Sequence, residues 1–196
     1  MIIAIKDKDR VVLGFVNTDR WDCISEKDYI DEENVAIKFS KTGKAFACAE
    51  TNRRSDVLLY DETFLELDVT PKTIVKEIVP HIKCSLQENN ISIDDNGNWG
   101  NCLIVCDNNT LYDVDPTFGF CEITDYICHG YNVDTLKSVL DATILLPAEE
   151  RIIKAVKFIS KIHKLNLFPF IITDTKDKQF KTITEEGVYN EYFNSI

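Results

Sequence analysis

The first 17 residues, MIIAIKDKDRVVLGFVN, constrain the fold most, because they contain two apolar stretches separated by one polar turn. Isoleucine and valine dominate both stretches, and β-branched side chains favour the pleated, half-buried surface of a sheet. Asp7, Lys8 and Asp9 supply the turn between them. We therefore predict a β-hairpin over Met1 to Asn17, on which the rest of the chain is built.

Length and composition favour one globular domain over residues 1–196. Hydrophobic residues make up 44% and charged residues 28% of the chain, which suffices for one sizeable core. The formal net charge of −11 repels phosphate backbones, so we predict no nucleic-acid partner. No apolar run is long enough to span a membrane, and the charges between Lys6 and Arg10 come too early for a secretory leader. We expect a cytoplasmic protein with no membrane partner.

The chain has seven cysteines, an odd number, and their spacing is irregular. Most lie inside apolar runs, which indicates reduced, buried thiols rather than disulfides. Cys102 and Cys106 lack a second Cys/His pair at metal-site spacing, so we predict no zinc site. The Asp94–Asn98 segment resembles the start of a calcium loop, but position twelve would be Leu103. We predict no metal and no cofactor.

Each of three further groups of residues has a possible functional role and an ordinary structural explanation. His129 follows Cys128, which suggests a base beside a thiol, but a turn residue above a helix start is the favoured reading. Asp113 and Asp115 are candidates for a cation site at a strand end, although a solvated turn is favoured. Trp21 and Trp99 lie in polar loops, where they pack on the core edge or mark an interface.

The remaining pattern alternates blocks of strands with blocks of helices. The predicted strands after the hairpin are Val35–Phe39, Ala45–Ala49, Leu103–Val105, Thr110–Val114, Phe120–Ile123, Tyr126–His129, Phe170–Asp174 and Phe180–Ile183. The predicted helices are Asn52–Tyr60, a run from Thr70 to Asn90 kinked at Pro80, one capped by Asn132 or Asp134, one opened by Pro147, and a short one in Glu185–Ile196. This order predicts an α+β fold in which two sheets face each other and helices cover the outer faces.

Lysines recur along the helix that Pro147 opens. They are Lys154, Lys157, Lys161 and Lys164, and their spacing places them opposite the apolar stripe of Ile152, Ile153, Val156 and Ile159. We interpret this row as a solvated helix face rather than a binding patch.

Several motifs together carry a resemblance to a known family. They are Leu103–Asp107, Leu111–Pro116 (LYDVDP), Tyr126–Asn132, Ala148-Glu149-Glu150 and Phe170–Asp174. In type and order they resemble the N-terminal-nucleophile (Ntn) hydrolases of the proteasome β-subunit type, including the peptidase of the bacterial two-component ATP-dependent protease. The resemblance covers about Met1 to Thr184 and implies a four-layer αββα sandwich.

Members of that family cut an amide bond with the side chain of a first mature Thr, Ser or Cys, whose own amine serves as base. A lysine on the third strand and an aspartate after the second assist. Here Met1 stands at the nucleophile position, and Val16 or Asn17 at the aspartate position, with Asp19 as the nearest acid. Val35 stands at the lysine position, with Lys38 elsewhere in the pleat. His129 stands where the family has a turn serine, and Phe168 where it has a later aspartate. None matches, so we predict no catalytic residue.

The resulting hypothesis is a non-catalytic, proteasome-like module that assembles with itself, as a ring or dimer, or binds another protein. We expect Met1 to be retained, because Ile2 disfavours its removal. The alternative is an Ntn amidohydrolase or peptidase with an unrecognised or processed nucleophile, for which Thr18 and Cys23 are candidates. Cleavage at either residue would remove the opening hairpin, and nothing before Val35 would replace it.

Overall fold

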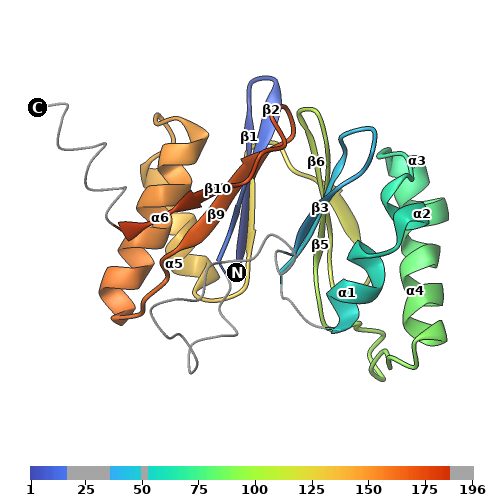
Figure 1. The fold of residues 1–196 in the computed structure, drawn as a ribbon. Coiled ribbons are helices and arrows are strands. Elements are labelled where there is room, and N and C mark those ends of the chain that lie inside the picture. Colours follow the sequence, from blue (N-terminus) through green and yellow to red (C-terminus); the bar gives the residue numbers. More distant parts are fainter. Residues whose placement is uncertain (17–35, 50–52, 186–196) are drawn as a thin grey trace, which may run out of the picture.

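A computed structural model describes residues 1–16, 36–49 and 53–185, and the description of the fold is limited to them. Two antiparallel five-stranded sheets form the centre of the structure (Figure 1). The strand order is β10-β9-β2-β1-β8 in the first sheet and β3-β4-β5-β6-β7 in the second. The predicted α+β class with two sheets is confirmed.

The opening hairpin lies inside the first sheet. This sheet contains β1 (Ile2–Asp7), β2 (Arg10–Phe15), β8 (Tyr126–His129), β9 (Phe170–Asp174) and β10 (Lys181–Ile183). β1 pairs on one side with β2, where Ile2 lies opposite Phe15, and on the other with β8, where Ile2 lies opposite His129. The predicted hairpin is therefore confirmed, with β1 held between two partners.

The second sheet follows the predicted strands closely. It contains β3 (Ile37–Phe39), β4 (Ala45–Cys48), β5 (Leu103–Asp107), β6 (Thr110–Val114) and β7 (Phe120–Glu122). The Phe46 ring on β4 contacts the Phe64 ring of a neighbouring helix, with 5.2 Å between centroids. Side chains alternate along a strand, so Ala45 and Ala47 face the first sheet. These small residues allow the two sheets to approach closely.

Helices flank the two sheets (Figure 1). They are α1 (Arg53–Leu59), α2 (Glu62–Leu65), α3 (Pro71–Thr73), the π-helix η2 (Ile74–Ile78), α4 (Val79–Glu88), α5 (Val133–Ala142) and α6 (Ala148–His163). α5 and α6 lie beside the first sheet, and α1, α2 and α4 lie beside the second. Among the described residues, no helix is both long and apolar enough to cross a membrane.

The expected kink at Pro80 takes a particular form. The helical run from Pro71 to Glu88 is interrupted by η2, in which the amide of Val79 donates to the carbonyl of Ile74. Proline cannot donate a hydrogen bond, and a wider turn beside it is one of the recognised ways to accommodate this. Thr70 caps the run as predicted, with its hydroxyl oxygen accepting from the amide of Thr73 at 3.1 Å.

The two faces of β1 belong to two different apolar cores. Ile3 and Ile5 pack in the cluster that includes α5 and α6, whereas Ile2 and Ala4 belong to the cluster that includes the second sheet. This period-two alternation is the one on which the hairpin prediction rests. α6 approaches β2 so closely that a Cβ at Gly14 would lie 2.5 Å from Ile152 Cγ2. The hairpin therefore forms part of both cores.

Candidate functional site

The start of β1 is the position at which the family resemblance expects the nucleophile. The Met1 amine donates to the carbonyl of Val16 at 2.9 Å and to that of Ala49 at 3.3 Å. Met1 is only 2% exposed and belongs to the apolar cluster that includes α5 and α6. A thioether has no hydroxyl or thiol proton to lose, so this side chain supplies packing rather than a nucleophile.

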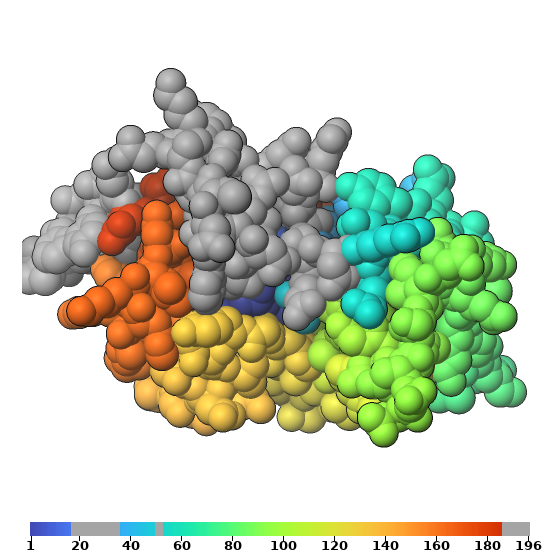
Figure 2. Space-filling view, turned by 90° about the horizontal axis from the view of Figure 1, so that it is seen from below, coloured from blue at the N-terminus to red at the C-terminus, as the bar shows by residue number. Residues whose placement is uncertain are grey.

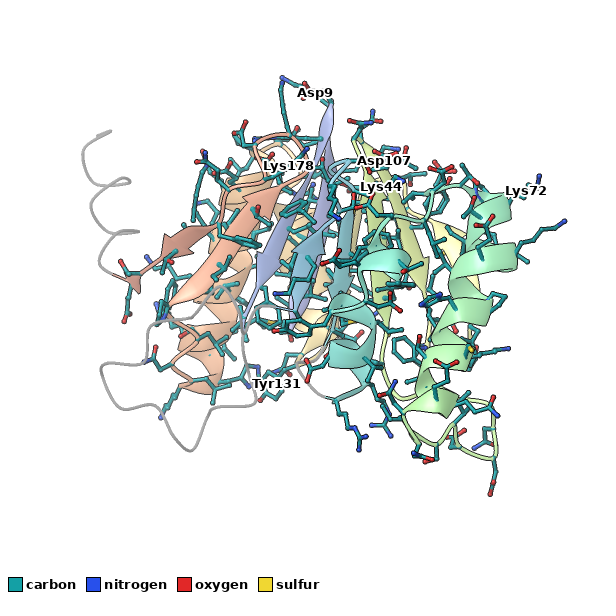
Figure 3. The ribbon with its side chains drawn as sticks, turned by 45° about the vertical axis from the view of Figure 1, so that its right-hand side comes forward. Asp9, Lys44, Lys72, Asp107, Tyr131 and Lys178 are labelled. Carbon is teal, nitrogen blue, oxygen red and sulfur yellow. The ribbon has the colours of Figure 1, made fainter. Side chains whose placement is uncertain are left out.

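A glycine turn covers the start of β1. Gly130, directly after β8, has φ +104°, and a Cβ built on it would lie 2.8 Å from Met1 Cα and 3.4 Å from Met1 N. Only a residue without a side chain fits this conformation and this contact. Figure 3 labels the next residue, Tyr131, at the end of the molecule opposite to Asp9. Met1 therefore lies at this end of the molecule, directly beneath the backbone of the Gly130 turn.

Two more positions that matter for the family chemistry hold apolar side chains. Val16 and Phe168 are buried and pack in the same cluster as Met1. The Phe168 ring also contacts the Phe170 ring, with 5.4 Å between centroids. Neither side chain can carry charge or move a proton. Asn17, Thr18, Asp19, Trp21, Cys23 and Val35 lie outside the described residues.

Lys38 lies on the helix side of the second sheet. Its Nζ is 4.7 Å from the centroid of the Tyr60 ring, and its charge acts on the carboxylate of Asp56 in α1. Burial raises the pKa of Asp56, and the nearby Lys38 charge partly opposes this. Lys38 therefore faces the helices beside the second sheet, on the same side as its cross-strand partner Phe46.

Lys44 is buried, and its ammonium makes three hydrogen bonds. Its Nζ donates to the carbonyls of Glu66 at 3.2 Å and Leu67 at 3.0 Å, and to Asp68 Oδ1 at 3.0 Å. No local sequence pattern predicts these contacts, because the partners of Lys44 lie 22 to 24 residues away. These hydrogen bonds anchor the segment after α2. Figure 3 shows Lys44 at the end of the molecule opposite to Tyr131.

His129 pairs with a residue of the other sheet, which the sequence did not predict. It ends β8, in agreement with the predicted strand Tyr126–His129. Its Nε2 lies 2.8 Å from Asp113 Oδ1 on β6, so the pair joins the two sheets. Asp115 lies close by. Burial raises the pKa of Asp115, but hydrogen bonds from Thr117 and Gly119 and the His129 charge lower it more, leaving the pKa below its ordinary value.

The thiol opposite Asp113 on the neighbouring strand is not activated. Cys121 lies opposite Asp113 across the β6–β7 ladder. Burial and the charges of Asp113 and Asp115 raise the pKa of the Cys121 thiol, which disfavours the thiolate. Among the described residues, no group of three or more His, Cys, Asp or Glu side chains could hold a metal ion. The arrangement therefore connects the sheets and offers no nucleophile.

Thiol labelling tests this description residue by residue. Cys84 and Cys121 are exposed, whereas Cys48, Cys106 and Cys128 are buried. Burial is the largest cause that raises the pKa of the three buried thiols, that of Cys128 to about 11. Among the described cysteines, we expect a short iodoacetamide pulse near neutral pH, read by peptide mass spectrometry, to modify Cys84 and Cys121 first. Rapid native-state labelling of a buried cysteine would contradict the structure.

Comparisons with known proteins define the class of fold. No protein-family model and no curated protein matches the chain. Solved structures do match. BPH from Thiobacillus denitrificans has a TM-score of 0.64 at 15% identity, over 89% of this chain and 97% of that one. The same protein in complex with epoxomicin has a TM-score of 0.65 at 13% identity, over the same shares.

A third structure extends the likeness. Anbu (ancestral beta-subunit) from Yersinia bercovieri has a TM-score of 0.62 at 15% identity, over 96% of this chain and 88% of that one. Together the three structures support a proteasome-like, Ntn-type fold for this chain. At such low identity they define the fold alone, and the activity has to be argued from the residues at the start of β1.

Proposed function

We propose that this chain is a non-catalytic, proteasome-like protein that acts as a self-assembling or partner-binding module. In this proposal residues 1–196 form one cytoplasmic domain, and the two sheets with their flanking helices form the four-layer αββα sandwich of the proteasome type. The start of β1 then serves as scaffold rather than as an active centre.

One observation carries the proposal, namely the packing of Met1. The position where the family has its nucleophile holds the buried thioether of Met1. The Met1 amine donates to the carbonyls of Val16 and Ala49. Acyl transfer in this family needs a hydroxyl or thiol beside that amine. Val16 and Phe168 add apolar side chains at two further family positions, so no described residue there replaces the missing chemistry.

Intact mass spectrometry with a covalent probe tests the proposal. The purified protein is treated with epoxomicin, the ligand bound to BPH. We expect the mass of a chain that begins at Met1, unchanged by the probe, and no cleavage of a panel of fluorogenic peptides. A chain that begins at Thr18, Cys23 or another Ser, Thr or Cys and gains the mass of the probe would overturn the proposal. An active Ntn peptidase of similar fold, treated in parallel, shows that the probe is reactive.

A further inference from the structure

Three lysines of the row on α6 border a hollow in the surface. The hollow has a volume of about 490 Å³, and Lys157, Lys161 and Lys164 are among the residues that line it. Of the residues that the structure describes, Glu185 is the only carboxylate in this lining. The lining therefore carries more positive than negative charge, in a chain whose net charge is −11. We call this feature the α6 hollow.

Apolar side chains lie in and beside the α6 hollow. Leu165 and Phe168 line it together with the lysines. On the adjoining face of α6, Phe158 is 44% exposed and Ile162 is 51% exposed, and they lie one turn apart on the helix. Exposed apolar groups beside charges are typical of surfaces that bind another protein segment. A segment that matches this surface would be both acidic and apolar.

Residues 186–196, which lie outside the described part of the chain, have this composition. Their sequence is EGVYNEYFNSI, with two glutamates and no lysine or arginine. Tyr189, Tyr192, Phe193 and Ile196 recur at the spacing of one helix face, in agreement with the short helix that the sequence predicts here. An acidic helix with an aromatic face matches a surface that presents lysines beside exposed apolar groups.

We propose that the α6 hollow binds the 186–196 segment of the same chain. The segment follows directly after Glu185, which already lines the hollow, so the covalent connection holds it there at a high effective concentration. Its glutamates face Lys161 and Lys164, and its aromatic face covers Phe158. This inference goes beyond the proposed function and does not depend on it.

The length of the segment agrees with this location. Eleven residues in a helix span about 16 Å, against about 24 Å for the 16 residues of α6. α6 and α4 lie at opposite ends of the molecule (Figure 2). A helix of this length that starts beside Glu185 therefore contacts α6 and not α4.

Hydrogen exchange of the full chain, read by mass spectrometry, tests the contact. The amides of residues 186–196 are expected to exchange more slowly than in the chain unfolded by urea, because docking orders them. Lys161→Glu combined with Lys164→Glu should speed this exchange about tenfold, because each substitution replaces an attraction by a repulsion. Lys72→Glu combined with Lys76→Glu makes the same change of net charge at exposed positions beside the second sheet, and should leave the exchange unchanged.

A compensating variant keeps the test independent of folding. Adding Glu186→Lys and Glu191→Lys to the double variant of α6 should restore most of the slow exchange, because the charges are then exchanged between the two partners. The docking would be overturned if the segment exchanges as fast in the wild-type protein as in the unfolded chain. Slow exchange that survives Lys161→Glu with Lys164→Glu would overturn it as well.

Carbodiimide crosslinking of mixed isotopically light and heavy full-length chains identifies the copy that supplies the segment. We expect amide crosslinks from Glu186 or Glu191 to the lysines of α6, each within a single light or a single heavy chain. Crosslinks that join light to heavy chains would show that a second copy supplies the segment, and would overturn the proposal. None of these outcomes affects the mass and probe experiment on Met1, so the two proposals fail separately.

Discussion

Replacing Gly130 by alanine is expected to lower the free energy of unfolding by about 3 kcal/mol or more, from backbone strain and overpacking together. The new Cβ would lie 2.8 Å from Met1 Cα, which belongs to the backbone and cannot rotate away. The residue would also be held at φ +104°, where side-chain-bearing residues are strained. The free energy is measured by urea unfolding followed by circular dichroism.

Gly97→Ala is the matched control for this prediction. Gly97 also has a positive φ, of +79°, but a Cβ there would meet nothing within 4 Å. It should therefore cost about 1 kcal/mol, which is the backbone term alone. The difference between the two variants isolates the contact of the turn with the start of β1. Equal losses would show that Gly130 does not press on Met1 in solution.

Local periodicity predicts most of the fold. The alternation in β1 and β2 specifies which side chains face α6 and which face the second sheet, so the hairpin and its two cores follow from spacing alone. Thr70 is recognised as a cap for the same reason, because the capping contact is made within three residues. α2 was missed, since four residues carry no period; only Asp61, which caps it by accepting from the amides of Thr63 and Phe64, marks its start.

The site depends on contacts that no local pattern encodes. The sequence predicts that His129 ends a strand, but only the packing of the two sheets brings it to Asp113, 16 residues earlier in the chain. The contact of Gly130 with Met1 likewise requires β8 to lie beside β1. The sequence alone does show that Met1, Val16 and Phe168 lack the side chains that the family's chemistry needs, because this depends only on residue identity. That the Met1 side chain is buried needed the structure.

Replacing Trp99 has the second large expected effect. Trp99 lies between Asn98 and Gly100, in a polar loop where the sequence left packing on the core edge or an interface open, and its side chain is fully buried. Its Nε1 donates to the carbonyl of Asp115 at 3.2 Å, and its ring stacks on the Phe118 ring, with 6.3 Å between centroids. Trp99→Ala should lower the free energy of unfolding by about 3 to 5 kcal/mol, since it leaves a large cavity.

Trp99→Phe separates the cavity from the hydrogen bond. Phenylalanine keeps most of the apolar volume but cannot donate to Asp115, so about 1 to 2 kcal/mol should be lost. Both variants are measured by the same urea unfolding. In both, the urea concentration at the midpoint of unfolding should fall, while the slope of the free energy of unfolding against urea should stay unchanged. If Trp99→Ala costs less than Trp99→Phe is expected to cost, Trp99 is not in the core. The loop would then be free to present its ring to a partner, which is the reading that the sequence left open.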